Sequence, residues 1–135
     1  ANDLALVDRD LVKAEALAND LRRAAPNLTV SVGNDAVAAA KGAAGVINCT
    51  PVGMVGYDGT PLPLAAMAMA SWAFDAVYTP VKTQFLTDAA ASGLQVISGW
   101  ELFFYQGVHA WEFFAGLPLD EDRLRADLMA AGDGA

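Results

Sequence analysis

The sequence is poor in the residues that build disulfide bonds and metal sites. Its 135 residues include one cysteine, Cys49, and one histidine, His109, which lie far apart in the sequence. One cysteine cannot form a disulfide bond within the chain, and this pair forms no metal-ligand cluster. We therefore expect no bound metal, a packing role for Cys49, which has no basic neighbour, and a cytoplasmic location.

Basic residues and long apolar runs are scarce as well. Eight Lys and Arg residues stand against sixteen Asp and Glu residues, which gives a formal net charge of −8 at pH 7. This charge disfavours a nucleic-acid partner, because a phosphate backbone repels an acidic surface. No apolar run approaches the roughly 18–20 residues that a membrane-spanning helix needs, so we expect no membrane segment.

The residues that are present favour an α/β protein. Apolar residues make up 55% of the sequence and charged residues 18%, which is typical of a sheet buried on both faces by helices. Because strand and helix patterns alternate along the chain, we expect a parallel sheet. The expected strands are 4–7, 28–32, 45–48, 72–77 and 95–97, and the expected helices are 11–24, 36–41, 83–91, 101–115 and 120–131.

The segment 48–54, Asn-Cys-Thr-Pro-Val-Gly-Met, is the most informative motif. It follows an apolar strand directly, and ligands of open α/β sheets bind where strands end in this way. Thr50 offers a hydroxyl group, and Gly53 allows a close approach of the backbone. The segment therefore predicts one wall of a ligand site.

The order of the elements lacks the beginning of a dinucleotide-binding sheet. Such a sheet begins with a strand, a glycine-rich turn and a helix, and none of these precedes Leu4. That strand lies at the centre of the usual order, so the strands before and after it have no common partner here. We therefore expect residues 1–135 to be the carboxyl-terminal part of a dinucleotide-binding domain. Its sheet would be Rossmann-like, doubly wound, parallel and incomplete, and the domain would include the helices at 101–115 and 120–131.

Three motifs follow one another in an order that resembles a known enzyme family. They are Asn-x-Thr-x-x-Gly-Met at 48–54, Asp-x-x-Tyr-x-Pro-x-x-Thr at 75–83, and a Gly-to-Gln segment at 99–106. Together they resemble the carboxyl-terminal half of the shikimate and quinate/shikimate dehydrogenases. The resemblance implies hydride transfer between a nicotinamide cofactor and a cyclic hydroxy acid, such as the interconversion of 3-dehydroshikimate and shikimate.

The resemblance also implies a division of labour between two domains. In this family an amino-terminal domain carries the catalytic Lys/Asp pair and binds most of the substrate. The chain has three lysines, Lys13, Lys41 and Lys82, and none has a matching context. We therefore expect no catalytic residue in this chain, and no turnover by residues 1–135 without the missing substrate domain.

The first strand is expected to end where such enzymes contact the adenine ribose. A carboxylate there accepts hydrogen bonds from the ribose hydroxyls and repels a 2′-phosphate. Asp8-Arg9-Asp10 replaces the Asn-Arg-Thr of NADP-using members, so we expect NAD to be favoured over NADP, although Arg9 could tolerate a phosphate. Alternatively, Asp8 and Asp10 only begin and cap the next helix. The residues expected to bind the cofactor are Asp8, Arg9, Thr50, Pro51, Val52, Ala76, Val77 and Gly99.

Tyr78 and Gln106 are the residues expected to contact the substrate. The resemblance points the Tyr78 phenol and the Gln106 amide at a substrate carboxylate or hydroxyl. Alternatively, Tyr78 is a half-buried hinge residue and Gln106 a structural amide with satisfied hydrogen bonds. An amide buried on the 101–115 helix would need partners, because burial without them costs roughly 1–3 kcal/mol.

Two functions remain open from the sequence. The first is the dehydrogenase, with a small-molecule substrate and the amino-terminal domain as partners. The second is a non-catalytic ligand-sensing or regulatory protein that keeps the dehydrogenase-like fold. The aromatic residues of the 101–115 helix are also compatible with packing against a second copy in a homodimer.

Overall fold

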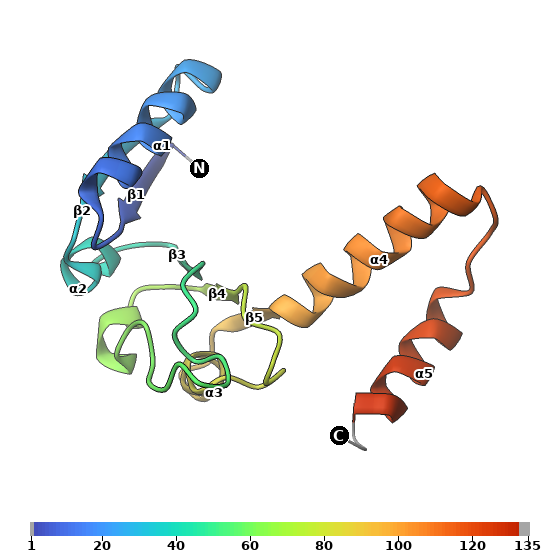
Figure 1. Ribbon diagram of the computed structural model, residues 1–135. Coiled ribbons are helices and arrows are strands. Elements are labelled where there is room, and N and C mark those ends of the chain that lie inside the picture. The colour runs from blue at the N-terminus through green and yellow to red at the C-terminus, as the bar shows by residue number, and fades with distance from the viewer. Residues whose placement is uncertain (1, 133–135) are drawn as a thin grey trace.

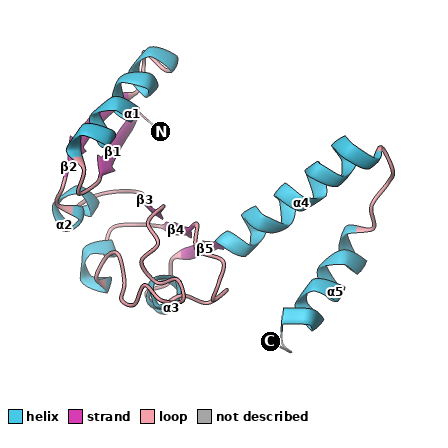
Figure 2. Ribbon diagram, in the orientation of Figure 1, coloured by secondary structure: helices cyan, strands magenta, loops and turns pink. Residues whose placement is uncertain are grey.

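The computed structural model describes residues 2–132 as alternating strands and helices (Figure 1, Figure 2). Each expected strand and helix is present, with ends that differ by at most two residues. No helix within the described part of the chain is both long and apolar enough to cross a membrane. The elements in order are β1 (Asp3–Val7), α1 (Leu11–Ala24), β2 (Thr29–Gly33), α2 (Ala36–Ala40), β3 (Gly45–Asn48), the 3₁₀ helix η1 (Leu64–Met67), β4 (Trp72–Asp75), α3 (Gln84–Ala91), β5 (Gln95–Ser98), α4 (Gly99–Ala115) and α5 (Glu121–Gly132).

Two expected boundaries are wrong for a clear reason. β4 ends at Asp75 rather than at residue 77, because the Val77 amide donates to the Asp75 carboxylate (3.0 Å). α4 begins at Gly99 rather than at residue 101. The segment 76–77 that follows β4 lies against Gly99 at the start of α4, and this contact forms part of the site described below.

The strands form two separate parallel sheets. β1 pairs with β2, and β3, β4 and β5 form the second sheet in that order. β1 and β3 do not pair with each other, so the sheet is interrupted between them. This is the position at which the sequence predicts that a central strand is lacking, and the parallel pairing confirms the α/β class.

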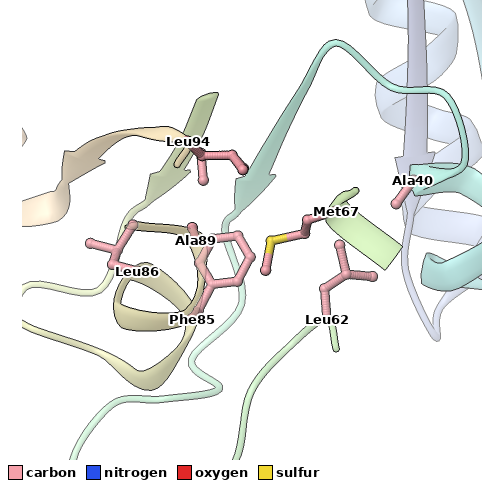
Figure 3. Packing of buried hydrophobic residues seen from close by; sticks show 8 residues of the cluster. Ala40, Leu62, Met67, Phe85, Leu86, Ala89 and Leu94 are labelled. Carbon is pink, nitrogen blue, oxygen red and sulfur yellow. The ribbon is translucent and has the colours of Figure 1, made fainter. Parts of the chain in front are cut away.

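The main core lies on one face of the second sheet. Ala73 of β4 belongs to this core. Phe85 and Leu86 of α3, Met67 of η1 and Leu62 are further members of it (Figure 3). On the opposite face the corresponding row is Ile47, Phe74 and Ile97, since paired residues of neighbouring strands share a face. Ile47 and Ile97 are 55% and 42% exposed. The expectation of a sheet buried on both faces is therefore wrong for this sheet within residues 2–132.

The two carboxyl-terminal helices form a second core of their own. After Gly116, whose φ of +62° is left-handed, the chain turns back and α5 packs against α4 (Figure 1). The Arg125 guanidinium donates two hydrogen bonds to the Glu101 carboxylate (2.7 and 3.0 Å) and lies 4.2 Å from the Phe104 ring centre. The hydrogen bond to Glu101 raises the pKa of Arg125. The cluster contains Trp100, Phe104 and Val108, with Leu119 and Leu124 packed against it.

The core predicts a large difference between two phenylalanines. Phe85 is 2% exposed and Phe113 is 83% exposed. We expect Phe85→Ala to lower the free energy of unfolding by about 3–5 kcal/mol, because it leaves a cavity under the sheet. The control Phe113→Ala should change it by less than about 0.5 kcal/mol. Urea unfolding followed by circular dichroism measures both, and equal losses would contradict this description of the core.

Candidate functional site

The ends of β3 and β4 lie side by side and open into a pocket. Asn48 and Asp75 form the last pair of residues between these two strands. The loops that follow enclose a volume of about 380 Å³, at the carboxyl ends of parallel strands, where α/β proteins bind ligands. The lining residues are Cys49, Thr50, Pro51 and Met54 from the first loop, and Ala76, Val77, Tyr78 and Thr79 from the second.

Asn48 holds the first loop in place. Its side chain is buried, and its Nδ2 donates to the Asp75 Oδ1 (2.9 Å) and to the Val52 carbonyl (3.1 Å). Its Oδ1 accepts from the Thr50 amide (3.0 Å) and from the Thr50 hydroxyl (2.7 Å). Both amide hydrogens and both oxygen lone pairs are thus used, so the amide orientation and the turn after β3 are fixed together.

Asp75 joins this loop to the second wall of the pocket. The residue is 0% exposed, and its Oδ1 also accepts from the Val77 amide (3.0 Å). Its Oδ2 accepts from the Thr83 hydroxyl (2.6 Å), and Thr83 caps the beginning of α3 by accepting from the Leu86 amide (3.3 Å). One carboxylate therefore connects two pocket loops with the start of a helix, through three uncharged donors.

Sequence analysis assigned no separate role to Asn48, Asp75 or Thr83. These residues belong to the two motifs that predict the pocket, yet their hydrogen bonds join positions that are 8 and 27 residues apart. The available signal was that polar side chains directly follow buried strands. Such residues need partners, because a buried polar group without one costs roughly 1–3 kcal/mol.

Gly99 allows α4 to begin directly against the second loop. A Cβ atom at this position would lie 2.5 Å from the Ala76 carbonyl oxygen and 2.6 Å from the Val77 carbonyl oxygen. The residue is buried and in contact with these two residues, so the backbone of 76–77 and the first turn of α4 form one unit. A contact between Gly99 and a cofactor stays a prediction.

Tyr78 and Gln106 lie toward the same side of α4. The Tyr78 ring is half exposed and stacks on Phe103, with the ring centres 5.1 Å apart and an interplanar angle of 11°. Phe103 and Gln106 are three residues apart in α4, and therefore neighbours on its surface. Gln106 is exposed, so the argument that burial forces partners on its amide is wrong. Its expected substrate contact now depends on the resemblance alone.

Asp8 and Arg9 lie at the end of β1, in the other sheet, and do not line this pocket. The Asp8 Oδ1 accepts from the Asp10 amide (2.8 Å), and the Asp10 carboxylate accepts from the amides of Val12 and Lys13 (both 3.1 Å). Asp10 therefore caps α1, which agrees with the expectation of a helix cap at this segment. Asp8 and Arg9 are exposed, which leaves the predicted cofactor contact sterically open.

Two further features bear on the choice of site. Cys49 is exposed in the pocket, so the expected packing role for this residue is wrong. A larger hollow of about 670 Å³ lies along α1 and β2, lined mainly by Leu11, Val12 and Ala16. None of the residues expected to bind cofactor or substrate lines this hollow, so the smaller pocket is the better candidate. Within residues 2–132, no three His, Cys, Asp or Glu side chains are grouped as metal ligands.

Comparisons with known proteins give a consistent result. No model of a known protein family matches the sequence. A quinate/shikimate dehydrogenase (NAD⁺) of Corynebacterium efficiens is 34% identical over 94% of this chain and 45% of its own length. A shikimate dehydrogenase (NADP⁺) of Pseudarthrobacter chlorophenolicus is 35% identical over 100% of this chain and 48% of its own length. The chain thus spans about half the length of these relatives.

The solved structures agree with the sequence relatives. A quinate dehydrogenase from Corynebacterium glutamicum in complex with NAD has a TM-score of 0.82 and 30% identity, over 96% of this chain and 46% of that one. A shikimate 5-dehydrogenase from Thermus thermophilus, in complex with NADP(H) and shikimate, has a TM-score of 0.70 and 30% identity, over 87% and 42%. The incomplete Rossmann-like fold is therefore confirmed.

The close contact at Gly99 predicts opposite effects for two glycines of α4. Gly99→Ala should lower the free energy of unfolding by about 1–3 kcal/mol, because the new methyl group meets backbone atoms. Gly107→Ala should raise it by about 0.5–1 kcal/mol, because nothing lies within 4 Å of its Cβ position and alanine favours a helix. Thermal unfolding of both variants measures the difference, and a Gly99→Ala variant as stable as Gly107→Ala would contradict the packing described.

Proposed function

Because the chain belongs to the shikimate/quinate dehydrogenase family, we propose that it forms the cofactor side of a nicotinamide-dependent oxidoreductase. The enzyme transfers a hydride between the cofactor and a cyclic hydroxy acid of the shikimate or quinate type, as in the interconversion of 3-dehydroshikimate and shikimate. The observation that carries this proposal is the pocket between Thr50 and Tyr78 at the ends of β3 and β4.

The residues of this pocket suit a nicotinamide ring. Pro51, Met54 and Val77 offer apolar surface to a flat ring, and Thr50 and Tyr78 offer hydroxyl groups to its polar substituents. When bound, the nicotinamide accepts or donates the hydride. The chain's own residues orient that ring and keep water from one side of it, which brings the reacting carbon atoms together.

The substrate is held by Tyr78, which lines the pocket, and by Gln106 of α4. The Tyr78 phenol and the Gln106 amide provide hydrogen bonds to a carboxylate or hydroxyl of the cyclic acid. Proton transfer falls to a Lys/Asp pair in the amino-terminal substrate domain. We therefore expect no turnover from residues 1–135 by themselves.

Asp8 favours NAD over NADP. A 2′-phosphate near an exposed carboxylate is repelled by up to about 4 kcal/mol at 4 Å and an effective dielectric constant near 20, and by less where water screens the pair. The relatives include both NAD⁺ and NADP⁺ enzymes, so the support for NAD is the Asp8 side chain itself.

The proposal predicts a dehydrogenase activity in the full-length gene product that contains this chain. Each of shikimate and quinate is combined with each of NAD⁺ and NADP⁺, and NAD(P)H is followed by its absorbance. Turnover is expected, with a higher kcat/KM for NAD⁺ than for NADP⁺. An absence of turnover with all four pairs would contradict the proposed function.

The cofactor preference has a matched pair of variants. Asp8→Asn should lower the ratio of kcat/KM for NAD⁺ to that for NADP⁺ about tenfold, because it removes the charge that faces the 2′-phosphate. Asp10→Asn removes a charge two residues away and keeps a good helix cap, so its effect on the ratio should be much smaller. Equal effects would assign the preference to overall charge rather than to Asp8.

A further inference from the structure

The Thr50 hydroxyl has one lone pair left to accept a hydrogen bond from a ligand. Its proton is donated to the Asn48 Oδ1 (2.7 Å), and one of its lone pairs accepts from the Val52 amide (3.2 Å). A hydroxyl has one donor and two acceptor sites, so a single lone pair remains. Since Thr50 lines the pocket, that lone pair is what it can offer to a ligand.

The direction of the Thr50 proton depends on the orientation of the Asn48 amide. The Thr50 backbone N–H can only donate, so the Asn48 atom that it meets (3.0 Å) must be the oxygen. The Asn48 nitrogen then faces the Asp75 carboxylate and the Val52 carbonyl, and both of these can only accept. Every group in this chain of contacts supports the same orientation.

Asp75 is the group that anchors this arrangement from the interior. Its Oδ1 accepts from the Asn48 amide, while its Oδ2 accepts from the hydroxyl of Thr83, which does not line the pocket. Burial of a carboxylate is costly unless hydrogen bonds compensate it, and Asp75 accepts from Asn48, Val77 and Thr83. The hydrogen bond from Asn48 is its connection to Thr50.

We propose that Asp75 is a positioning residue which, through Asn48, holds the Thr50 hydroxyl as a hydrogen-bond acceptor toward the pocket, so that the pocket takes a ligand group that donates there. This inference rests on the proposed function and makes it more specific. At the nicotinamide end of the dinucleotide two kinds of group can donate, the carboxamide NH₂ and the hydroxyls of the adjoining ribose. A ligand that presents only an acceptor to Thr50 is rejected.

The first test measures dissociation constants by isothermal titration calorimetry of the full-length gene product. NAD⁺ is compared with 3-acetylpyridine adenine dinucleotide, in which a methyl group replaces the carboxamide NH₂. Thr50→Val, which lacks the acceptor, should weaken NAD⁺ binding about tenfold, whereas Thr50→Ser should keep it within about threefold. If only NAD⁺ binding weakens, the carboxamide is the donor; if both dinucleotides weaken equally, a ribose hydroxyl is the donor.

Unchanged NAD⁺ affinity in Thr50→Val, or an equal loss in Thr50→Ser, would overturn the inference. Failure of the unaltered protein to bind either dinucleotide would contradict the proposed function instead. The two failures are therefore distinguishable.

The second test separates positioning by Asp75 from a general structural role. Asp75→Ala as a single substitution should weaken NAD⁺ binding about tenfold. Added to Thr50→Val, it should weaken NAD⁺ binding by less than a further factor of about three, because Asp75 acts through Thr50. Asp75→Asn should keep the affinity within about threefold, because its oxygen can still accept from Asn48 and Val77. If Asp75→Ala does not fold, Asp75→Ser takes its place, because a serine side chain is too short to contact Asn48 but leaves a small polar group.

Thr83→Val is the control for stability. It removes the Oδ2 partner of Asp75 and leaves the contact with Asn48, so the unfolding temperature should fall while the NAD⁺ affinity changes less than about threefold. Independent losses from Asp75→Ala and Thr50→Val, or a loss of affinity in Thr83→Val as large as in Asp75→Ala, would show that Asp75 only stabilises the fold, and would overturn the proposal.

Discussion

The hydrogen bonds of the buried Asp75 carboxylate are the constraint on which the candidate site depends. They connect the end of β3, the loop after β4 and the beginning of α3 through three uncharged donors. Because the pocket walls come from the first two of these segments, their spacing is set by a single side chain. A loop held in this way binds ligand without first having to become ordered, which lowers the entropic cost of binding.

The remaining elements support this centre in different ways. Gly99 lets α4 begin against the 76–77 backbone, and the Phe103 side chain of the same helix stacks on Tyr78. The ion pair between Arg125 and Glu101 holds α5 against α4. By contrast, the sheet is interrupted between β1 and β3, and Ile47 is exposed on its open face.

Local patterns in the sequence were sufficient to predict the strands, the α-helices and the first wall of the pocket, but not the 3₁₀ helix η1. An apolar strand followed at once by small polar residues indicated the first loop, the family resemblance indicated the second, and Asp10 caps α1 as its position suggested. The links between distant segments were not predictable in this way. Periodicity does not show that Asp75 meets Asn48, or that Arg125 meets Glu101 24 residues earlier.

Exposure was the other quantity that the sequence could not supply. Composition gives the number of apolar residues but not their positions, so it suggested a sheet covered on both faces, whereas Ile47 and Ile97 are exposed on one face. In the same way, the sequence analysis considered Cys49 and Gln106 as buried residues, and both are exposed. The resemblance assigned roles to residues, and the geometry supplied the polarity of the Thr50 hydroxyl.

The most direct measurement is a crystal structure of the full-length gene product with NAD⁺ bound. The account predicts that the nicotinamide end lies between Thr50 and Tyr78, with a donor group of the ligand about 2.7–3.2 Å from the Thr50 Oγ1. The Asn48 and Asp75 contacts should be unchanged. A dinucleotide bound away from this pocket, or one that presents an acceptor to Thr50, would contradict the account.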